Sequence, residues 1–352
     1  MSDARRAAPL TGTARPVAPD APMAYHPRMP QAAQSLRHPR AVVHAARIAG
    51  VALAAVLTAA PPARAQDTPE SAKAKQDVLW AQMEDSIRAI ARGTDAVVGV
   101  AVLDLTDRHT FALNADAAYP TASTIKLAVL AELYRQHATG TGARLTDPYV
   151  VEAKDAIPES DILGGLTPGV TRLTNRDLAT MMIAVSDNGA TNLLIDRVGM
   201  DKVNAMLDGL GLRVTRLRRR MLDLPAARAG RENTASPREL VALLDALHAG
   251  KVLGAKAATD EFFAMLATNK MSYLPRLLPE GVRVANKPGW LDGVRSDAGI
   301  VFVPNRPFAI AVMTTFGRDH PQLELAIARI GRAAYAYFDR VGRSSALGRT
   351  MP

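Results

Sequence analysis

Ser123 and Lys126 stand three residues apart in the apolar run YPTASTIKLAVLAEL, at positions 119–133. The run predicts a helix, and residues i and i+3 lie on one helical face. A lysine buried among apolar side chains loses hydration, which lowers its pKa and makes a neutral amine available as a base. A serine needs such a base to become a nucleophile. The alternative is a helix-capping serine beside a lysine that reaches out to solvent, and the pair alone does not exclude it.

Two further motifs follow in chain order. Ser-Asp-Asn at 186–188 lies between two predicted helices, and Lys-Pro-Gly at 287–289 ends a predicted strand. Each is common by itself, as a turn or a strand end. The order S-x-x-K, S-D-N, K-T-G is the signature of class A β-lactamases and penicillin-binding proteins. With proline replacing the threonine, residues from about 75 to 340 resemble the class A β-lactamase-like family of serine hydrolases.

The resemblance implies catalytic roles for four residues. Ser123 attacks the lactam carbonyl, and Lys126 acts as the base or as part of a proton relay. Ser186 passes a proton to the leaving nitrogen, with Lys287 beside it to tune the electric field. Asp187 is expected to cap the next helix, which is a structural role.

The resemblance also implies a set of substrate-binding positions. Asn188 donates a hydrogen bond to the substrate's side-chain amide, and Arg295 helps to hold the substrate carboxylate. The backbone N–H groups of Ser123 and of Trp290, which follows Gly289, form the oxyanion hole. One such donor is worth roughly 10²–10³ in rate.

Pro288 is the first departure from the family pattern. It lacks the hydroxyl that contacts the substrate carboxylate, so Arg295 is left to hold that group. Proline cannot donate to a strand ladder, and position 288 is therefore expected at an open sheet edge.

The second departure is the loop RRRMLDLPAARAGREN. The family carries a glutamate here, within E-x-x-L-N, which activates the water that removes the acyl group. A gapless count places Met221 at that position, and the nearest acids are Asp223 and Glu232. A missing general base costs roughly 10²–10⁴ in rate. Asp223 is the candidate replacement base; the alternative is a solvated or helix-capping aspartate.

The elements that position these residues predict an α/β fold of the α+β type. Its five-stranded antiparallel sheet is flanked by N- and C-terminal helices and carries an inserted all-helical lobe. The predicted strands are 97–106, 109–116, 282–289, 295–304 and 308–317. A catalytic domain at 66–342 would comprise a sheet lobe (66–118 and 280–342) and a helical lobe (119–279), followed by a flexible tail at 343–352.

The N-terminal segment 1–65 reads as a signal peptide with an extended n-region, cut near Ala65, or else as a membrane anchor. Its apolar run is short for a span, so the chain is expected to be secreted or periplasmic, without a stable membrane anchor. Met29 is a candidate true start. The segment carries eight Arg and two Asp of the chain's 43 basic and 34 acidic residues, and the remainder is nearly balanced. Nucleic-acid binding therefore loses its main support, and no nucleic-acid partner is expected.

Three functions remain open. The first is a monomeric β-lactamase, the second an enzyme acting on D-Ala-D-Ala cell-wall peptides, and the third a protein that traps a β-lactam as a stable acyl-enzyme. The sequence has no cysteine and no metal-ligand spacing among its seven histidines, so neither metal nor cofactor is expected.

Overall fold

A computed structural model describes residues 69–351. The predicted signal peptide at 1–65, with its cleavage near Ala65, and the candidate start at Met29 lie outside the described residues. Within the described residues, no helix is long and apolar enough to cross a membrane.

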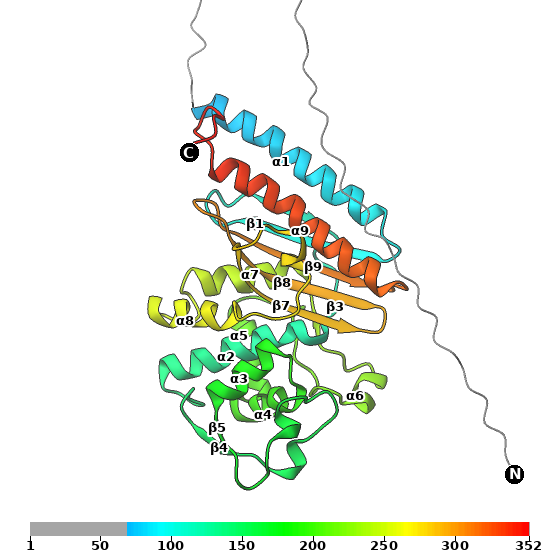
Figure 1. The fold of residues 1–352 in the computed structure, drawn as a ribbon, viewed down its shortest axis with the longest axis vertical. Coiled ribbons are helices and arrows are strands. Elements are labelled where there is room, and N and C mark those ends of the chain that lie inside the picture. The colour runs from blue at the N-terminus through cyan, green and yellow to red at the C-terminus, as the bar shows by residue number, and fades with distance from the viewer. Residues whose placement is uncertain (1–68, 352) are drawn as a thin grey trace, which may run out of the picture. The chain divides into compact units, whose positions relative to one another are not determined.

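A five-stranded antiparallel sheet forms the centre of the fold, in the order β2-β1-β9-β8-β7 (Figure 1). This confirms the predicted sheet, built from strands at both ends of the chain. The edge strand β7 carries the Lys-Pro-Gly motif, so Pro288 stands where proline is tolerated. The strands are β1 (Val97–Asp104), β2 (Thr110–Leu113), β7 (Arg283–Leu291), β8 (Val294–Phe302) and β9 (Phe308–Thr315).

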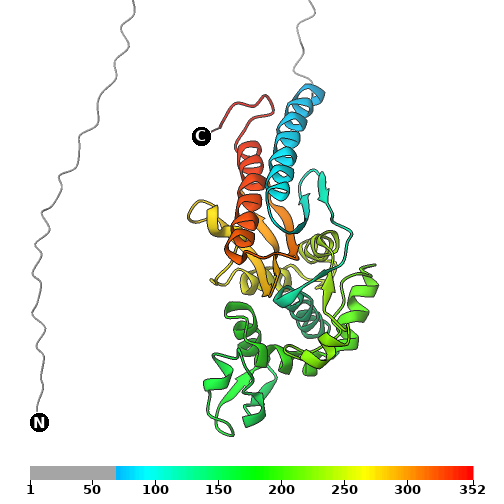
Figure 2. The same ribbon diagram turned by 90° about the vertical axis from the view of Figure 1, so that its right-hand side faces the viewer.

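Helices cover both faces of this sheet. α1 (Pro69–Arg92) and α9 (His320–Gly342) lie side by side over one face (Figures 1 and 2), where Trp80, Phe338 and Val100 belong to one hydrophobic core. Side chains alternate along each strand, so the neighbouring Ala101 faces the second core. That core holds α7 (Pro237–His248), which packs on three strands of the sheet. α7 lies within the predicted helical lobe at 119–279, yet it packs on the sheet.

Four helices pack around α2 (Lys126–Thr139), whose first nine residues are all buried. They are α3 (Asn175–Ala184), α4 (Asn188–Val198), α5 (Met200–Gly209) and α8 (Lys256–Leu266). The short helix α6 (Leu224–Arg228) lies within the loop at 218–233. Short strands connect them: β3 (Tyr119–Pro120) pairs with β6 (Thr234–Ala235), and β4 (Pro148–Val150) with β5 (Arg172–Thr174).

Helix starts follow the sequence signals closely. The predicted capping box of Thr174 and Asp177 opens α3.

The C-terminal tail, for which the sequence predicts flexibility, turns back on itself. Ser344 bridges Thr350, and the Met351 N–H donates to the backbone of Arg343.

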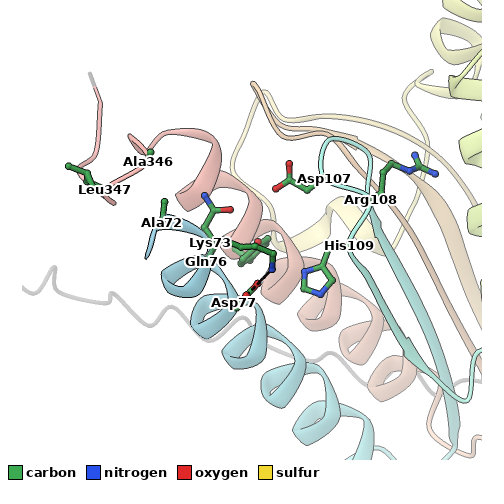
Figure 3. Close-up of a pocket in the computed structure, with 10 residues that line it drawn as sticks. Ala72, Lys73, Gln76, Asp77, Asp107, Arg108, His109, Ala346 and Leu347 are labelled. Carbon is green, nitrogen blue, oxygen red and sulfur yellow. Dashed lines mark hydrogen bonds and ion pairs between the residues drawn. The ribbon is translucent and has the colours of Figure 1, made fainter. Parts of the chain in front are cut away.

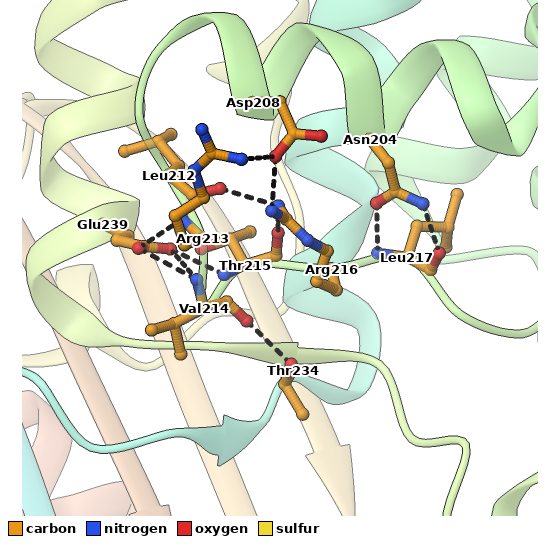
Figure 4. Close-up of polar contacts among 10 residues, drawn as sticks. All are labelled: Asn204, Asp208, Leu212, Arg213, Val214, Thr215, Arg216, Leu217, Thr234 and Glu239. Carbon is orange, nitrogen blue, oxygen red and sulfur yellow. Dashed lines mark hydrogen bonds and ion pairs between the residues drawn. The ribbon is translucent and has the colours of Figure 1, made fainter.

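Side chains from two helices fix the segment that leads into the loop at 218–233 (Figure 4). The Glu239 carboxylate of α7 accepts hydrogen bonds from the N–H groups of Arg213, Val214 and Thr215, at 2.6–3.0 Å. Asn204 of α5 exchanges two hydrogen bonds with the backbone of Leu217. These contacts hold the entry of the loop against the helices.

Replacing Glu239 with alanine should destabilise the fold, because three backbone donors lose one charged acceptor. We expect the free energy of unfolding to fall by about 2–3 kcal/mol, measured by urea denaturation. Glu280→Ala is the matched control, since Glu280 is exposed on a turn. Equal losses in the two variants would contradict the role assigned to Glu239.

Candidate functional site

Lys126 is the first residue of α2 and is fully buried. A short 3₁₀ helix, η1 (Ala122–Ile125), precedes it and carries Ser123. The amine of Lys126 donates to the carbonyl oxygen of Ser186 at 2.6 Å, to its Oγ at 3.0 Å and to Asn188 Oδ1 at 2.9 Å. The expected burial of Lys126 is thus confirmed, and its hydrogen-bond acceptors come from the Ser-Asp-Asn motif.

Ser123 is partly exposed and lines a cavity of about 370 Å³ together with Ser186, Asn188, Met221 and Trp290. The expected direct contact of its hydroxyl with the Lys126 amine is not formed: among residues 69–351 no hydrogen bond joins the two groups. Catalytic hydrogen bonds in substrate-free sites are commonly loose and tighten when substrate binds.

Gly289 brings the edge strand β7 directly against Ser123. A Cβ at this position would lie 2.7 Å from the carbonyl oxygen of Thr121 and 2.9 Å from the backbone nitrogen of Ser123. Any side chain would push the strand away from η1, so glycine is required. The close approach places Trp290, the next residue, at the same cavity as Ser123.

Ser186 stands between two lysines. Its Oγ lies 3.0 Å from the Lys126 amine and 3.1 Å from the Lys287 amine, and the backbone of Ser186 has a φ of 60°. A non-glycine residue in this left-handed region must be held there by its surroundings. The structure therefore brings together the four residues predicted to be catalytic.

Burial sets the protonation of both amines. Desolvation, followed by the neighbouring Lys287 charge, lowers the pKa of Lys126 well below its usual value. Desolvation likewise lowers the pKa of Lys287 to about 7, and Asp297 partly opposes this shift. A neutral amine is a base and a charged one is an acid, so Lys287 can hold or release a proton near neutral pH, and burial favours the neutral form of Lys126.

Asp297 belongs to the site's surroundings, and the sequence analysis missed it. It is fully buried on β8, and its carboxylate accepts hydrogen bonds from the backbone of Tyr273 and Leu274, both at 3.0 Å, and from Asn286 at 2.7 Å. Burial raises the pKa of Asp297. An acid in a predicted strand, directly before its apolar residues, was the signal that could have identified it.

Asp187 and Asn188 take different roles. Asp187 caps α4 by accepting from the Ala190 N–H at 2.9 Å, as expected. Asn188 bridges two ionisable side chains: its Oδ1 accepts from Lys126, and its Nδ2 donates to Glu159 Oε2 at 3.0 Å. Glu159 was not singled out in the sequence, because nothing local distinguishes a loop glutamate near the site from other surface acids.

The loop at 218–233 places Met221 at the cavity, held by two hydrogen bonds between its backbone and the side chain of Asn192. Asp223 instead caps α6, accepting from the Ala226 N–H at 3.0 Å. Asp223 does not line the cavity. The candidate replacement base is thus used as a helix cap, the alternative that the sequence left open.

Arg295 lies on the opposite face of β8 from the site. Its Nε donates to Glu324 of α9 at 3.1 Å, and it lines a separate cavity of about 680 Å³. Trp290 lines both cavities. The structure does not bring Arg295 to Ser123, so a role in holding the substrate carboxylate gains no support from this geometry.

Cavity size alone does not identify the site. A larger cavity of about 790 Å³ lies between the start of α1, the β1–β2 turn and the C-terminal tail (Figure 3). Its Lys73 and Asp77 pair with each other at 2.9 Å. Neither residue is buried, so this cavity offers no activated nucleophile. Among residues 69–351, no group of three or more His, Cys, Asp or Glu side chains could hold a metal ion.

The fold and the serine–lysine centre together define a serine hydrolase of the β-lactamase and penicillin-binding-protein type. Comparison with family models matches residues 82–338 to a model described as the β-lactamase enzyme family. The chain belongs to that family.

Similar proteins agree with this placement. A β-lactamase from Streptomyces fradiae is 31% identical over 81% of this chain and 91% of its own length. The solved structure of a β-lactamase from Sphaerobacter thermophilus is 35% identical, with a TM-score of 0.66 over 73% of this chain and 97% of its own. The structure of PBP-A is 25% identical, with the same TM-score of 0.66 over 73% of this chain and 95% of its own.

Lys287 should make stability depend on pH. Between its folded pKa of about 7 and the unfolded value of about 10.4, the unfolded chain binds more protons. The free energy of unfolding should therefore rise with pH in that window. Lys287→Met removes this titrating group. The free energy of unfolding of the variant, measured by urea denaturation from about pH 7 to about pH 9, should therefore rise less steeply with pH than that of the wild type. The same pH dependence in the variant and the wild type would contradict the assignment of a buried, neutral amine to Lys287.

Proposed function

We propose that the protein is an exported β-lactamase that hydrolyses the β-lactam amide through an acyl-enzyme on Ser123. The observation that carries the proposal is the single hydroxyl of Ser186, held between the amines of Lys126 and Lys287 beside Ser123. Export is supported by the composition of residues 1–65, with a basic stretch, a short apolar run and a small-residue site before Gln66.

Acylation uses the depressed pKa of Lys126. Its neutral amine takes the proton of Ser123, whose oxygen then bonds to the lactam carbonyl carbon. The backbone N–H groups of Ser123 and Trp290 would stabilise the negative oxygen. The C–N bond of the ring then breaks, and Ser186 delivers a proton to the nitrogen, replaced by one from the Lys126 or Lys287 amine. The product is an ester on Ser123.

Deacylation requires an activated water, and the apolar Met221 favours a second candidate. A residue with no proton acceptor lines the cavity where the family carries a glutamate, and Asp223 is used as a cap. A long-lived acyl-enzyme, as in a cell-wall peptidase or a β-lactam trap, would follow. One similar solved structure, of a PBP-A point mutant, is an acyl-enzyme complex with penicillin G.

Ser123→Ala tests the nucleophile. With penicillin G, the wild type should gain the mass of one intact drug and then lose it as hydrolysed product accumulates, whereas the variant should gain none. Intact-mass spectra over time measure both. Absence of an adduct on folded wild-type protein would refute the assignment, and an adduct that never clears would favour the second candidate.

Met221→Glu tests the missing base. A carboxylate placed at the cavity by the same backbone contacts should speed loss of the acyl group by roughly 10²-fold. Met221→Gln is the matched control, because a glutamine side chain has the shape of glutamate but cannot accept a proton from water. Equal deacylation rates in the two variants, followed by intact mass, would show that a base at this position does not limit turnover.

A further inference from the structure

The outer face of α9 carries a row of arginines. The inner face of this helix buries apolar side chains such as Ile327 and Phe338 in the core under the sheet. The exposed arginines, called here the arginine row, are Arg329, Arg332, Arg340 and Arg343. Their spacing keeps them on one face, because an α-helix turns once in about 3.6 residues, and at about 1.5 Å per residue the row is about 20 Å long.

The acids of α9 leave most of this charge unpaired. The helix contains two acids, and Asp339 pairs with Arg343 at the end of the row, at 2.7 Å. The other acid, Glu324, pairs with Arg295 of β8 at 3.1 Å and so faces the sheet. The remaining three arginines of the row form no ion pair with residues 69–351. Their positive charge is therefore available to an external partner.

The part of α1 that borders the row is uncharged. The two helices lie side by side (Figures 1 and 2), and a groove of about 170 Å³ lies between them. Arg340 is the one charged side chain among the described residues that line this groove. Val78, Gln82 and Ser86 of α1 recur every four residues and share one helical face, and the last two line the groove. No acid in the groove therefore opposes the row.

This surface suits an anionic lipid layer better than a nucleic acid. A straight row along one helix can bring all its guanidinium groups to a plane of phosphate groups at once, and guanidinium binds phosphate through paired hydrogen bonds. A basic helical face is typical of proteins that lie on membrane surfaces. Single-stranded nucleic acid is usually held by exposed aromatic rings, and every Trp, Tyr and Phe of α1 and α9 is buried.

We propose that the arginine row binds the protein reversibly to an anionic phospholipid surface. The inference concerns a surface remote from catalysis, since no residue of α1 or α9 lines the Ser123 cavity. Arg295, which contacts α9, lies on the opposite face of β8 from Ser123, so the bound protein keeps its cavity open. The buried inner face of α9 cannot insert into lipid, and binding is therefore electrostatic and weakened by salt.

Sedimentation with lipid vesicles tests this surface. The exported protein is mixed with vesicles of phosphatidylcholine alone, or of equal parts phosphatidylcholine and phosphatidylglycerol, and the bound fraction is measured in the pellet. The wild type should bind the mixed vesicles but not the neutral ones, and added salt should release it. The double variant Arg329→Gln, Arg332→Gln should bind about 25-fold more weakly, because each charge near the surface contributes about fivefold.

The matched control is the double variant Arg228→Gln, Arg231→Gln. It removes the same charge from exposed positions in and just after α6, away from α9 (Figure 1). It should bind like the wild type, and urea denaturation should show that both double variants are folded. Equal losses in the two variants would overturn the inference, because net charge would then explain binding. Wild-type protein that ignores mixed vesicles, binds neutral ones equally, or binds only soluble heparin would overturn it as well.

Discussion

Two lysine amines buried against one serine hydroxyl are the constraint on which the site depends. Lys126 and Lys287 are both within 3.1 Å of Ser186 Oγ, and neither is open to solvent. Two charges cannot be kept in such a place without a large desolvation cost. The protein keeps the pKa of both amines low, and a proton can then move among them and the hydroxyl. Under the proposed function, the stability lost to burying these amines keeps a base beside the nucleophile.

Such a cluster requires rigid walls, and the sheet supplies one of them. Two hydrophobic cores, one on each face, fix the central strands. The edge strand β7 can then approach η1 so closely that only glycine fits at position 289. Asp297, buried behind the strand and satisfied by three or more hydrogen bonds, provides negative charge that partly offsets the burial of Lys287. Fold stability and site electrostatics are therefore coupled through β7 and β8.

Carboxylates are distributed unevenly around the cavity that Ser123 and Ser186 line. At the position where the resemblance places a deacylating glutamate, Met221 presents an apolar side chain. A carboxylate lies instead at another part of the wall, where Glu159 accepts a hydrogen bond from Asn188. Under the proposed function, acylation of Ser123 and release of its ester therefore depend on separate segments of the chain.

The sequence by itself determined what depends on local pattern. Alternating apolar residues identified the five strands, capping residues such as Thr174 marked helix starts, and three short motifs located the four residues around Ser186. Tertiary structure decided the rest. The roles of Glu159 and Asp297, the orientation of Arg295 toward α9 and the packing of α7 on the sheet depend on contacts between residues far apart in the chain. Local propensity carries no information about such contacts, because they exist only once the strands and helices have packed.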